Sequence, residues 1–305
     1  MSIAKPRNAS LVDTISAGYR ALHRRPGAIA IPAAVSAYLW LGPPLGLGPL
    51  ADGLRDRLGA LGGMLGSERD ALLIESVLLS DVRLALAWLN FMPVLGPPRG
   101  GASGAVGLAG PWQLAAAALL INLLALLLSS YFLTLLGEAV SGERRPPLWS
   151  ARRALAVAGD IVRYLLALAA VGLVLALPFL AISAIVIATL PGATLAILLG
   201  WYIALFWAYV YTGFAPEAIL ISRSGPLRAI YHSVALVRRD LTGTLGLLLL
   251  SFVIASGLGV IWQRLAPSPP GLALAILGSA YIGSGLSAAR LEFYRERMAR
   301  WALSG

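Results

Sequence analysis

The sequence predicts an all-α polytopic membrane protein with six transmembrane helices, and three observations carry this prediction. Of the 305 residues, 58% are hydrophobic and only 12% are charged, whereas soluble domains carry about 25% charged residues. Two runs without a charge, residues 114–136 and 164–190, exceed the roughly 20 apolar residues that cross a bilayer as a helix. The net charge of +10 gathers beside such apolar runs.

Six apolar segments are predicted as membrane spans. They are residues 28–41, 114–136, 161–190, 193–214, 245–262 and 272–289. The first is the shortest because Pro43 and Pro44 follow it, and consecutive prolines end a helix. Pro178 lies inside the third span and predicts a kink there. Residues 191–192 and 266–271 are predicted to form the tight turns within the last two pairs of spans.

Basic residues determine the expected orientation. Six spans place both termini on one side, and most of the 24 basic residues fall in the segments on that side. Basic and acidic residues of the other side balance, so the whole net charge belongs to the first side. The positive-inside rule makes that side cytoplasmic. Arginines scattered beside apolar runs suit anionic headgroups rather than nucleic acid, so no nucleic-acid partner is expected.

The composition is rich in Ala, Gly, Leu, Arg and Pro and poor in Lys, which points to a bacterial chain. The expected location is therefore the bacterial cytoplasmic membrane, with both termini in the cytoplasm. The first 25 residues hold no apolar core of a signal peptide, so the first span is expected to target the chain.

The sequence lacks several motifs that are typical of enzymes. It contains no cysteine, which excludes disulfides, thiolate metal sites and a cysteine nucleophile. It contains no HExxH, no GxxxxGK[ST] and no GxSxG motif. Neither a metal nor a cofactor is expected, and no catalytic residue is assigned.

The segment ahead of the first span, residues 10–26, is predicted to be an amphipathic helix. Ser10 and Asp13 have the spacing of a capping box. Apolar residues then recur at helical spacing until Arg24 and Arg25 end the segment. A helix this short and charged is expected to lie in the membrane interface with its arginines toward the headgroups.

The same design recurs in residues 224–240 before span five and, more weakly, in residues 148–166 before span three. The chain is therefore expected to repeat as three hairpins, each with a cytoplasmic surface helix. A fourth surface helix, residues 290–305, follows the last span. The arginines expected to contact anionic headgroups are Arg24, Arg25, Arg152, Arg153, Arg238 and Arg239.

We expect one integral membrane domain, residues 1–305, with an interfacial helix in residues 1–27 and an external insertion in residues 51–110. Within the insertion, leucines recur at helical spacing between charges, which predicts two amphipathic helices. The alternative is a seventh span around residues 82–95, although it would reverse the charge pattern. Whether residues 68–97 enter the membrane stays open.

Residues 213–250 carry a recognisable pattern: Glu217 follows a span, Gly225, Pro226 and Ser233 come next, and an arginine pair precedes the following span. This pattern resembles the membrane domain associated with glycerophosphoryl diester phosphodiesterases and the YciC-like inner-membrane proteins. The start of the chain is similar to uncharacterised bacterial membrane proteins. The resemblance covers a small part of the chain and implies a helical bundle. It does not imply the activity, because the phosphodiesterase's catalytic barrel has no counterpart in the sequence.

Three hypotheses for function follow. The preferred one is a non-enzymatic membrane protein that interacts with anionic lipid, or a scaffold or subunit of a membrane complex. The alternatives are a transporter for a small uncharged or amphipathic solute and a membrane-embedded enzyme. Span interiors lack the ionisable residues that transporters usually keep there. The polar residues available to the alternatives are Asn122, Asp160, Arg163, Glu217 and His232.

Each of these polar residues also has an ordinary structural explanation. Asn122 is the strongest polar residue inside a span and is expected to make a helix–helix hydrogen bond of about 1 kcal/mol. The charged residues at the ends of spans are expected to pair with one another or to extend toward the headgroups.

Overall fold

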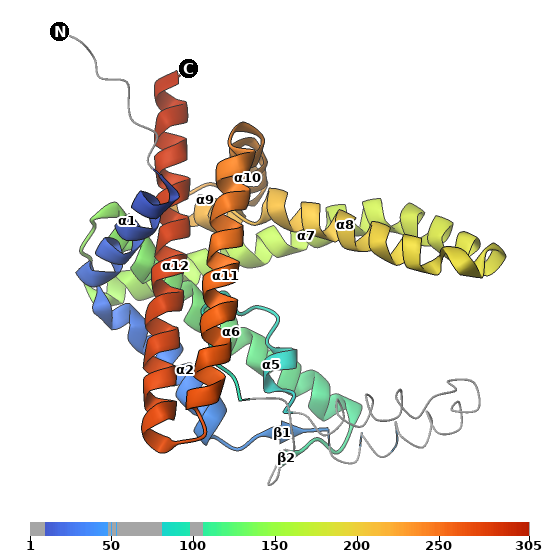
Figure 1. The fold of residues 1–305 in the computed structure, drawn as a ribbon, viewed down its shortest axis with the longest axis horizontal. Coiled ribbons are helices and arrows are strands. Elements are labelled where there is room, and N and C mark those ends of the chain that lie inside the picture. The colour runs from blue at the N-terminus through green and yellow to red at the C-terminus, as the bar shows by residue number, and fades with distance from the viewer. Residues whose placement is uncertain (1–9, 48–49, 51–52, 54–80, 98–105, 305) are drawn as a thin grey trace. The chain divides into compact units, whose positions relative to one another are not determined.

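The computed structural model describes residues 10–47, 50, 53, 81–97 and 106–304 (Figure 1). Within that part the chain is helical, apart from a short parallel pairing of β1 (Leu45–Gly46) with β2 (Val106–Gly107). The all-α class is therefore confirmed. Most of the two helices predicted for the external insertion falls outside the described residues.

Five helical segments of the described chain are long and apolar enough to cross a membrane, which is consistent with a membrane location. They are α6 (Pro111–Ser141), α7 (Pro147–Thr189), α8 (Thr194–Thr212) continued by α9 (Ala215–Ile221), α11 (Leu241–Leu265) and α12 (Pro269–Ser304). The first predicted span forms a shorter apolar helix instead, made of η1 (Pro26–Ile29) and α2 (Ala30–Leu41). It stops at Gly42 because two prolines follow.

The chain divides into two compact units. Unit 1 comprises Met1–Arg25, Leu133–Val253 and Gly285–Gly305, and unit 2 comprises Pro26–Phe132 and Ile254–Ser284. The helices α6, α11 and α12 each contribute residues to both units. Sequence patterns reveal helices but not how helices from distant segments group together.

Three helices of unit 1 begin in the same register: α1 (Leu11–Arg24), α7, and α10 (Pro226–Arg239). In each one the fourth, eighth, eleventh and twelfth residues are buried. These are Thr14, Gly18, Ala21 and Leu22 in α1; Ser150, Ala154, Val157 and Ala158 in α7; and Ala229, Ser233, Leu236 and Val237 in α10. The repeat inferred from hydropathy therefore has a counterpart in the positions that unit 1 buries.

The helices α1 and α10 also end in the same kind of corner. Arg25 follows α1 with φ −139° and ψ 66°, and Asp240 follows α10 with φ −138° and ψ 61°. The N–H of Arg25 donates to the Leu22 carbonyl at 2.9 Å, and that of Asp240 donates to the Leu236 carbonyl at 3.0 Å. Both helices thus end at the arginine-rich junctions that the sequence predicted, before η1 and α11 begin.

The third copy lacks this corner. The equivalent position in α7 is Ile161, which is fully buried, and the helix continues through it to Thr189. The predicted separate surface helix is therefore the first part of one helix of 43 residues, which includes Pro178. The Asp240 carboxylate accepts from the Gly243 N–H at 3.0 Å, and Arg25 pairs with Glu138 at 2.8 Å. The apolar side chain of Ile161 can form neither contact, so it does not stabilise a turn at this position.

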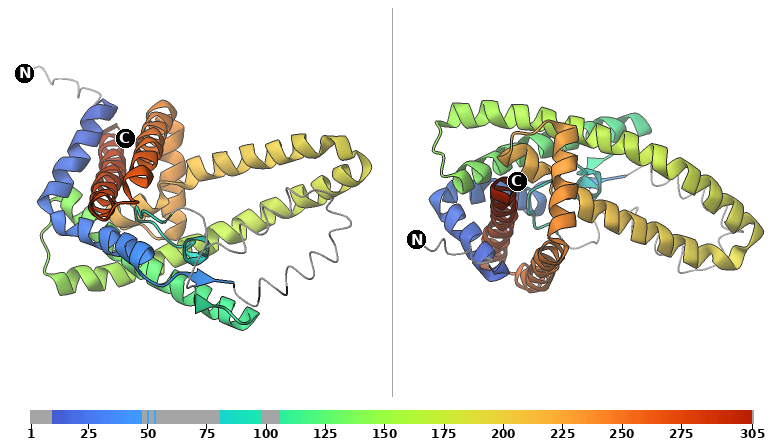
Figure 2. Two further views of the ribbon diagram at one scale, coloured as in Figure 1. Left: turned by 60° about the horizontal axis from the view of Figure 1, so that its bottom comes forward. Right: turned by 90° about the horizontal axis from the view of Figure 1, so that it is seen from above.

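The helices α7 and α8 form an antiparallel hairpin within unit 1 (Figures 1 and 2). The rings of Phe179 and Trp201 lie 4.6 Å apart, and the Trp201 indole donates to Ser183 at 3.2 Å. In α7, no residue of the most apolar stretch is buried. In α8 and α9 together, only 6% of the residues in the most apolar stretch are buried. So large an apolar surface requires a hydrocarbon or protein environment around it.

Gly18 brings α1 against α12, and an added Cβ would overlap the backbone of Ala289. A Gly-to-Ala change inside a helix normally stabilises it by about 1 kcal/mol. We expect Gly18→Ala to lower the Tm of the purified protein instead, whereas Ser16→Ala on the exposed side of α1 leaves it unchanged or raises it. Thermal unfolding in detergent measures both, and a raised Tm for Gly18→Ala would contradict this packing.

Candidate functional site

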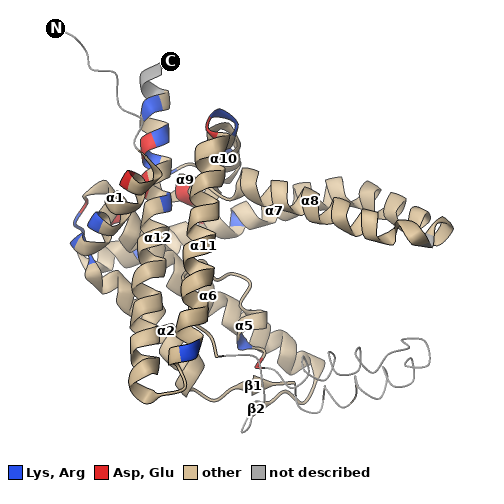
Figure 3. Ribbon diagram, viewed as in Figure 1, with Lys and Arg blue, Asp and Glu red and all other residues tan. Residues whose placement is uncertain are grey.

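Charged side chains of unit 1 gather around α1, α9, α10 and the end of α12, while the α7–α8 hairpin is almost free of them (Figure 3). Three of the carboxylates are buried: Glu138 is completely buried, Glu292 is 4% exposed and Glu217 is 7% exposed. A buried carboxylate is stable only with charged or hydrogen-bonding partners. These partners determine what the surrounding arginines do.

Glu138, near the end of α6, binds residues of two other segments. The Arg25 guanidinium lies 2.8 Å from its Oε2 atom. The Ser150 hydroxyl of α7 lies 3.0 and 2.9 Å from its two carboxylate oxygens. Arg25 also donates to the Arg145 carbonyl at 3.2 Å. Glu138 therefore ties the corner after α1 to α6 and α7.

Glu217 on α9 has the equivalent place in the next copy, since it precedes Pro226 by the same separation as Glu138 precedes Pro147. Its Oε1 atom lies 2.9 Å from Nε of Arg290 in α12. Arg290 also donates to the Gly213 carbonyl at 2.6 Å. This second buried ion pair ties the α8–α9 junction to α12.

The arginines predicted to contact headgroups divide into two groups. Arg25 and Arg153 bind inside unit 1: Arg153 lies 3.4 Å from Glu143 and donates to the Leu220 carbonyl at 2.9 Å. Both side chains are therefore engaged by acceptors of unit 1. The others have exposed side chains: Arg24, which also reaches a backbone carbonyl, Arg152, Arg238 and Arg239.

Asp160 and Arg163 form an ion pair of 3.1 Å one turn apart on α7, with side chains 34% and 73% exposed. Pairing at the end of a span was the ordinary explanation given for them. An exposed pair of this kind contributes less than about 1 kcal/mol and offers no enclosed site.

His232 of α10 hydrogen-bonds within unit 1 rather than with a carboxylate. Its Nδ1 atom lies 3.2 Å from the Ser224 hydroxyl and 3.4 Å from the Tyr294 hydroxyl. Glu217, the carboxylate that acid–base catalysis with His232 would need, binds Arg290 instead. The structure therefore gives the two residues separate partners, and the Glu217–His232 pair needed for acid–base catalysis is not formed.

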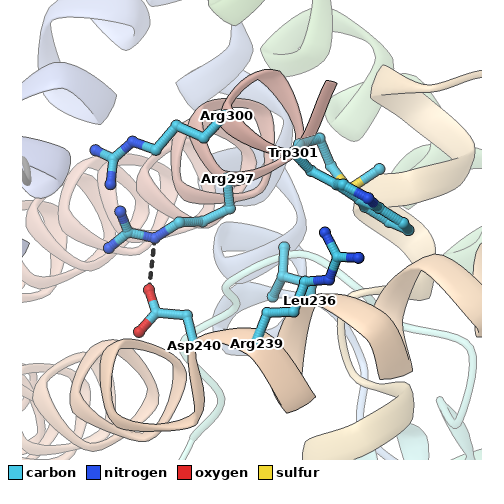
Figure 4. A pocket seen from close by; sticks show the side chains of 7 residues that line it. Leu236, Arg239, Asp240, Arg297, Arg300 and Trp301 are labelled. Carbon is cyan, nitrogen blue, oxygen red and sulfur yellow. Dashed lines mark ion pairs between the residues drawn. The ribbon is translucent and has the colours of Figure 1, made fainter. Parts of the chain in front are cut away.

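An open hollow of about 480 Å³ lies in unit 1 at the ends of α10 and α12 (Figure 4). Its lining consists of Leu236, Arg239, Asp240, Arg297, Met298, Arg300 and Trp301. Nε of Arg297 lies 2.6 Å from Asp240. The Arg239 guanidinium lies over the Trp301 ring, 4.1 Å from its centroid. Three arginines thus surround this space with a single acidic residue among them.

In unit 2, Asn122 holds an irregular segment in place. Its Oδ1 accepts from the Leu89 N–H at 2.9 Å, and its Nδ2 donates to the Leu86 carbonyl at 2.7 Å. Asn122 was expected to hydrogen-bond to another helix, but these two bonds join it to the backbone of the segment that contains Leu86 and Leu89. Within residues 81–97 only α5 (Arg83–Leu86) is helical, so a seventh spanning helix over residues 82–95 is not formed.

The same segment is anchored by Arg83, which is 6% exposed. Its guanidinium lies 2.6 Å from Asp81 and donates to the Leu39 carbonyl at the end of α2 at 2.7 Å. Burial alone raises the pKa of Asp81, but hydrogen bonds from Arg83 and from backbone N–H groups outweigh it and lower the pKa below its usual value. No sequence pattern linked Arg83 to α2, because the contact depends on tertiary structure.

Comparison with protein-family models, with curated proteins and with solved structures finds no match to this chain. The resemblance carried by residues 213–250 therefore stays a prediction. Function has to be inferred from the geometry of the two units.

Loss of the buried ion pair should destabilise the protein strongly. Arg25→Ala leaves the Glu138 carboxylate buried with only the Ser150 hydroxyl, and breaking such a pair costs about 3–5 kcal/mol. Arg163→Ala, which breaks the exposed pair with Asp160, should cost less than about 1 kcal/mol. Unfolding in mild detergent compares the two variants, and equal losses would contradict the structural role of Glu138.

His232 should make stability depend on pH. Burial lowers its pKa from the ordinary 6.5, and the charge of Arg228 lowers it further. The unfolded chain therefore binds more protons than the folded chain below about pH 6.5, and the free energy of unfolding falls as the pH drops. The Tm from about pH 8 to pH 5 should decline less in His232→Asn than in the wild type. Identical slopes would show that His232 does not titrate in this way.

Proposed function

We propose that the protein is an integral membrane protein that binds anionic lipid, with the hollow at the ends of α10 and α12 as the headgroup site. The observation that carries the proposal is the composition of this hollow, where Arg239, Arg297 and Arg300 face one acid, Asp240. A guanidinium presents several N–H donors in a fixed planar arrangement that suits phosphate oxygens. The net positive lining therefore favours a phosphate group.

The position of the hollow along the chain supports a lipid rather than a soluble anion. Asp240 directly precedes α11, whose length and apolar character suit a membrane crossing. The start of a span is the depth at which headgroups lie, and arginine and tryptophan are both favoured there. Trp301 gives the hollow an apolar wall beside Arg239.

In this proposal, α1, α10 and the first part of α7 form an amphipathic collar at the cytoplasmic face of a bacterial inner membrane. Both termini then lie in the cytoplasm. The support is the concentration of the net charge of +10 on the segments that precede and follow the spans. Arg152 and Arg238 are exposed on this collar and add to its attraction for anionic lipid.

Lipid retention tests the proposal. Full-length protein is extracted from vesicles containing equal phosphatidylglycerol and phosphatidylcholine, and bound lipid is counted by native mass spectrometry. The wild type should retain the anionic lipid preferentially. Arg239→Ala combined with Arg300→Ala should reduce this preference several-fold, because two of the guanidinium groups that line the hollow are lost.

The matched control is Arg152→Ala, which removes an exposed arginine outside the hollow. An equal loss in this variant would mean diffuse attraction by surface charge and would contradict a headgroup site. Inorganic phosphate is added in a second arm. Full competition by phosphate, with no preference between the lipids, would identify a soluble anion as the ligand and overturn the lipid assignment.

A further inference from the structure

A second hollow lies wholly within unit 2, between α2 and α6, with the irregular segment 84–94 as its floor. It encloses about 840 Å³, within the range of about 300–1,000 Å³ that is typical of ligand pockets. Its lining is almost entirely apolar, with Ala34 and Val35 from α2 and Ala117 and Leu124 from α6. None of these residues belongs to the proposed headgroup site.

The floor of this hollow is fixed rather than collapsible. Besides the bonds of Asn122, the Ser129 hydroxyl accepts from the Phe91 N–H at 2.9 Å. The Ser36 hydroxyl accepts from the Leu95 N–H at 3.0 Å. Irregular backbone among apolar helices is tolerated only when its polar groups are satisfied in this way. The segment is therefore held in place by hydrogen bonds from α2 and α6, and it does not fill the space between them.

We infer that this hollow holds one acyl chain of a membrane lipid. Its wall on α6 runs from Ala117 to Leu128, a distance of about 17 Å along the helix. One leaflet of a bilayer contributes about half of the roughly 30 Å hydrocarbon thickness. The wall is thus as long as one leaflet is deep, and an apolar space of this kind excludes water.

The hollow is continuous with apolar surface of α6 that suits contact with lipid. Leu120 and Leu124 line it and are 57% and 50% exposed. Leu119 and Leu123 follow the same helix just outside it and are 73% and 50% exposed. An acyl chain can therefore enter from the hydrocarbon beside α6 without crossing a polar barrier.

The polar side chains at the hollow are engaged by the protein itself, so they do not select a lipid by its headgroup. Arg83 is engaged by Asp81 and by backbone carbonyls. The Oδ1 atom of Asn90 accepts from the Met92 N–H at 3.1 Å. The site therefore selects an apolar chain irrespective of headgroup charge. This property separates it from the proposed anionic site of unit 1.

Photolabelling of the full-length protein tests the inference. Vesicles carry either phosphatidylcholine or phosphatidylglycerol with a diazirine group on the same acyl chain, and labelled peptides are identified by mass spectrometry. Both lipids should label peptides from α2, residues 84–94 and α6 equally. Ala34→Trp combined with Ala117→Trp fills the hollow with indole and should reduce this labelling several-fold. Ala116→Trp, one residue away and outside the lining, should leave it unchanged.

Several outcomes would overturn the inference. They are unchanged labelling in the double variant, an equal reduction in Ala116→Trp, labelling by phosphatidylglycerol alone, and crosslinks from these peptides to a second copy of the chain in place of lipid. If the double variant shows no cooperative unfolding transition and is therefore misfolded, the same photolabelling is measured with Ala117→Phe alone, which should also reduce it. Arg239→Ala with Arg300→Ala should leave the labelling intact, so failure of the headgroup site and failure of this one are distinguishable.

Discussion

Unit 1 depends on the buried ion pair between Arg25 and Glu138. A carboxylate without exposed surface is tolerated only when charged and hydrogen-bonding groups surround it, and here the corner after α1 and Ser150 of α7 supply them. One requirement of electrostatics thus joins the corner after α1 to α6 and α7, which follow much later in the sequence. The pair between Glu217 and Arg290 meets the same requirement one copy later, where it connects α9 with α12.

Features that depend on contacts within a turn or two could be predicted from the sequence. The capping box is formed as its spacing indicated, with the Asp13 N–H donating to the Ser10 hydroxyl at 3.2 Å and the Ser10 N–H donating to Asp13 at 3.0 Å. Long uncharged runs likewise predicted the spanning helices. Hydropathy is a local quantity, and it determines whether a segment is helical and apolar without reference to its neighbours.

Features that depend on a distant partner could not be predicted in this way. Hydropathy treats Arg25 and Arg152 alike, although one pairs with a buried acid and the other is exposed. Two signals were nevertheless present. Glu138 precedes the start of α7 by the same separation as Glu217 precedes the start of α10. Ile161 of α7 stands where α1 and α10 are followed by a polar residue, and α7 is the helix that continues past this position. The bonds from Asn122 to the irregular segment had no such signal, because a loop presents only backbone to its partner.

The unbroken junction in α7 has a mechanical consequence. α1 and α10 each end at a single residue, Arg25 or Asp240, whose side chain is held by an ion pair or caps the next helix. Helical hydrogen bonds continue across the equivalent point of α7. Its charged first part and its apolar second part therefore belong to one continuous helix. From Pro147 to Pro178 this helix is about 47 Å long, so a tilt of about 10° at its first turn would displace Pro178 by about 8 Å. Of the three copies, this is the one whose helix continues without a break from the charged residues into the apolar hairpin.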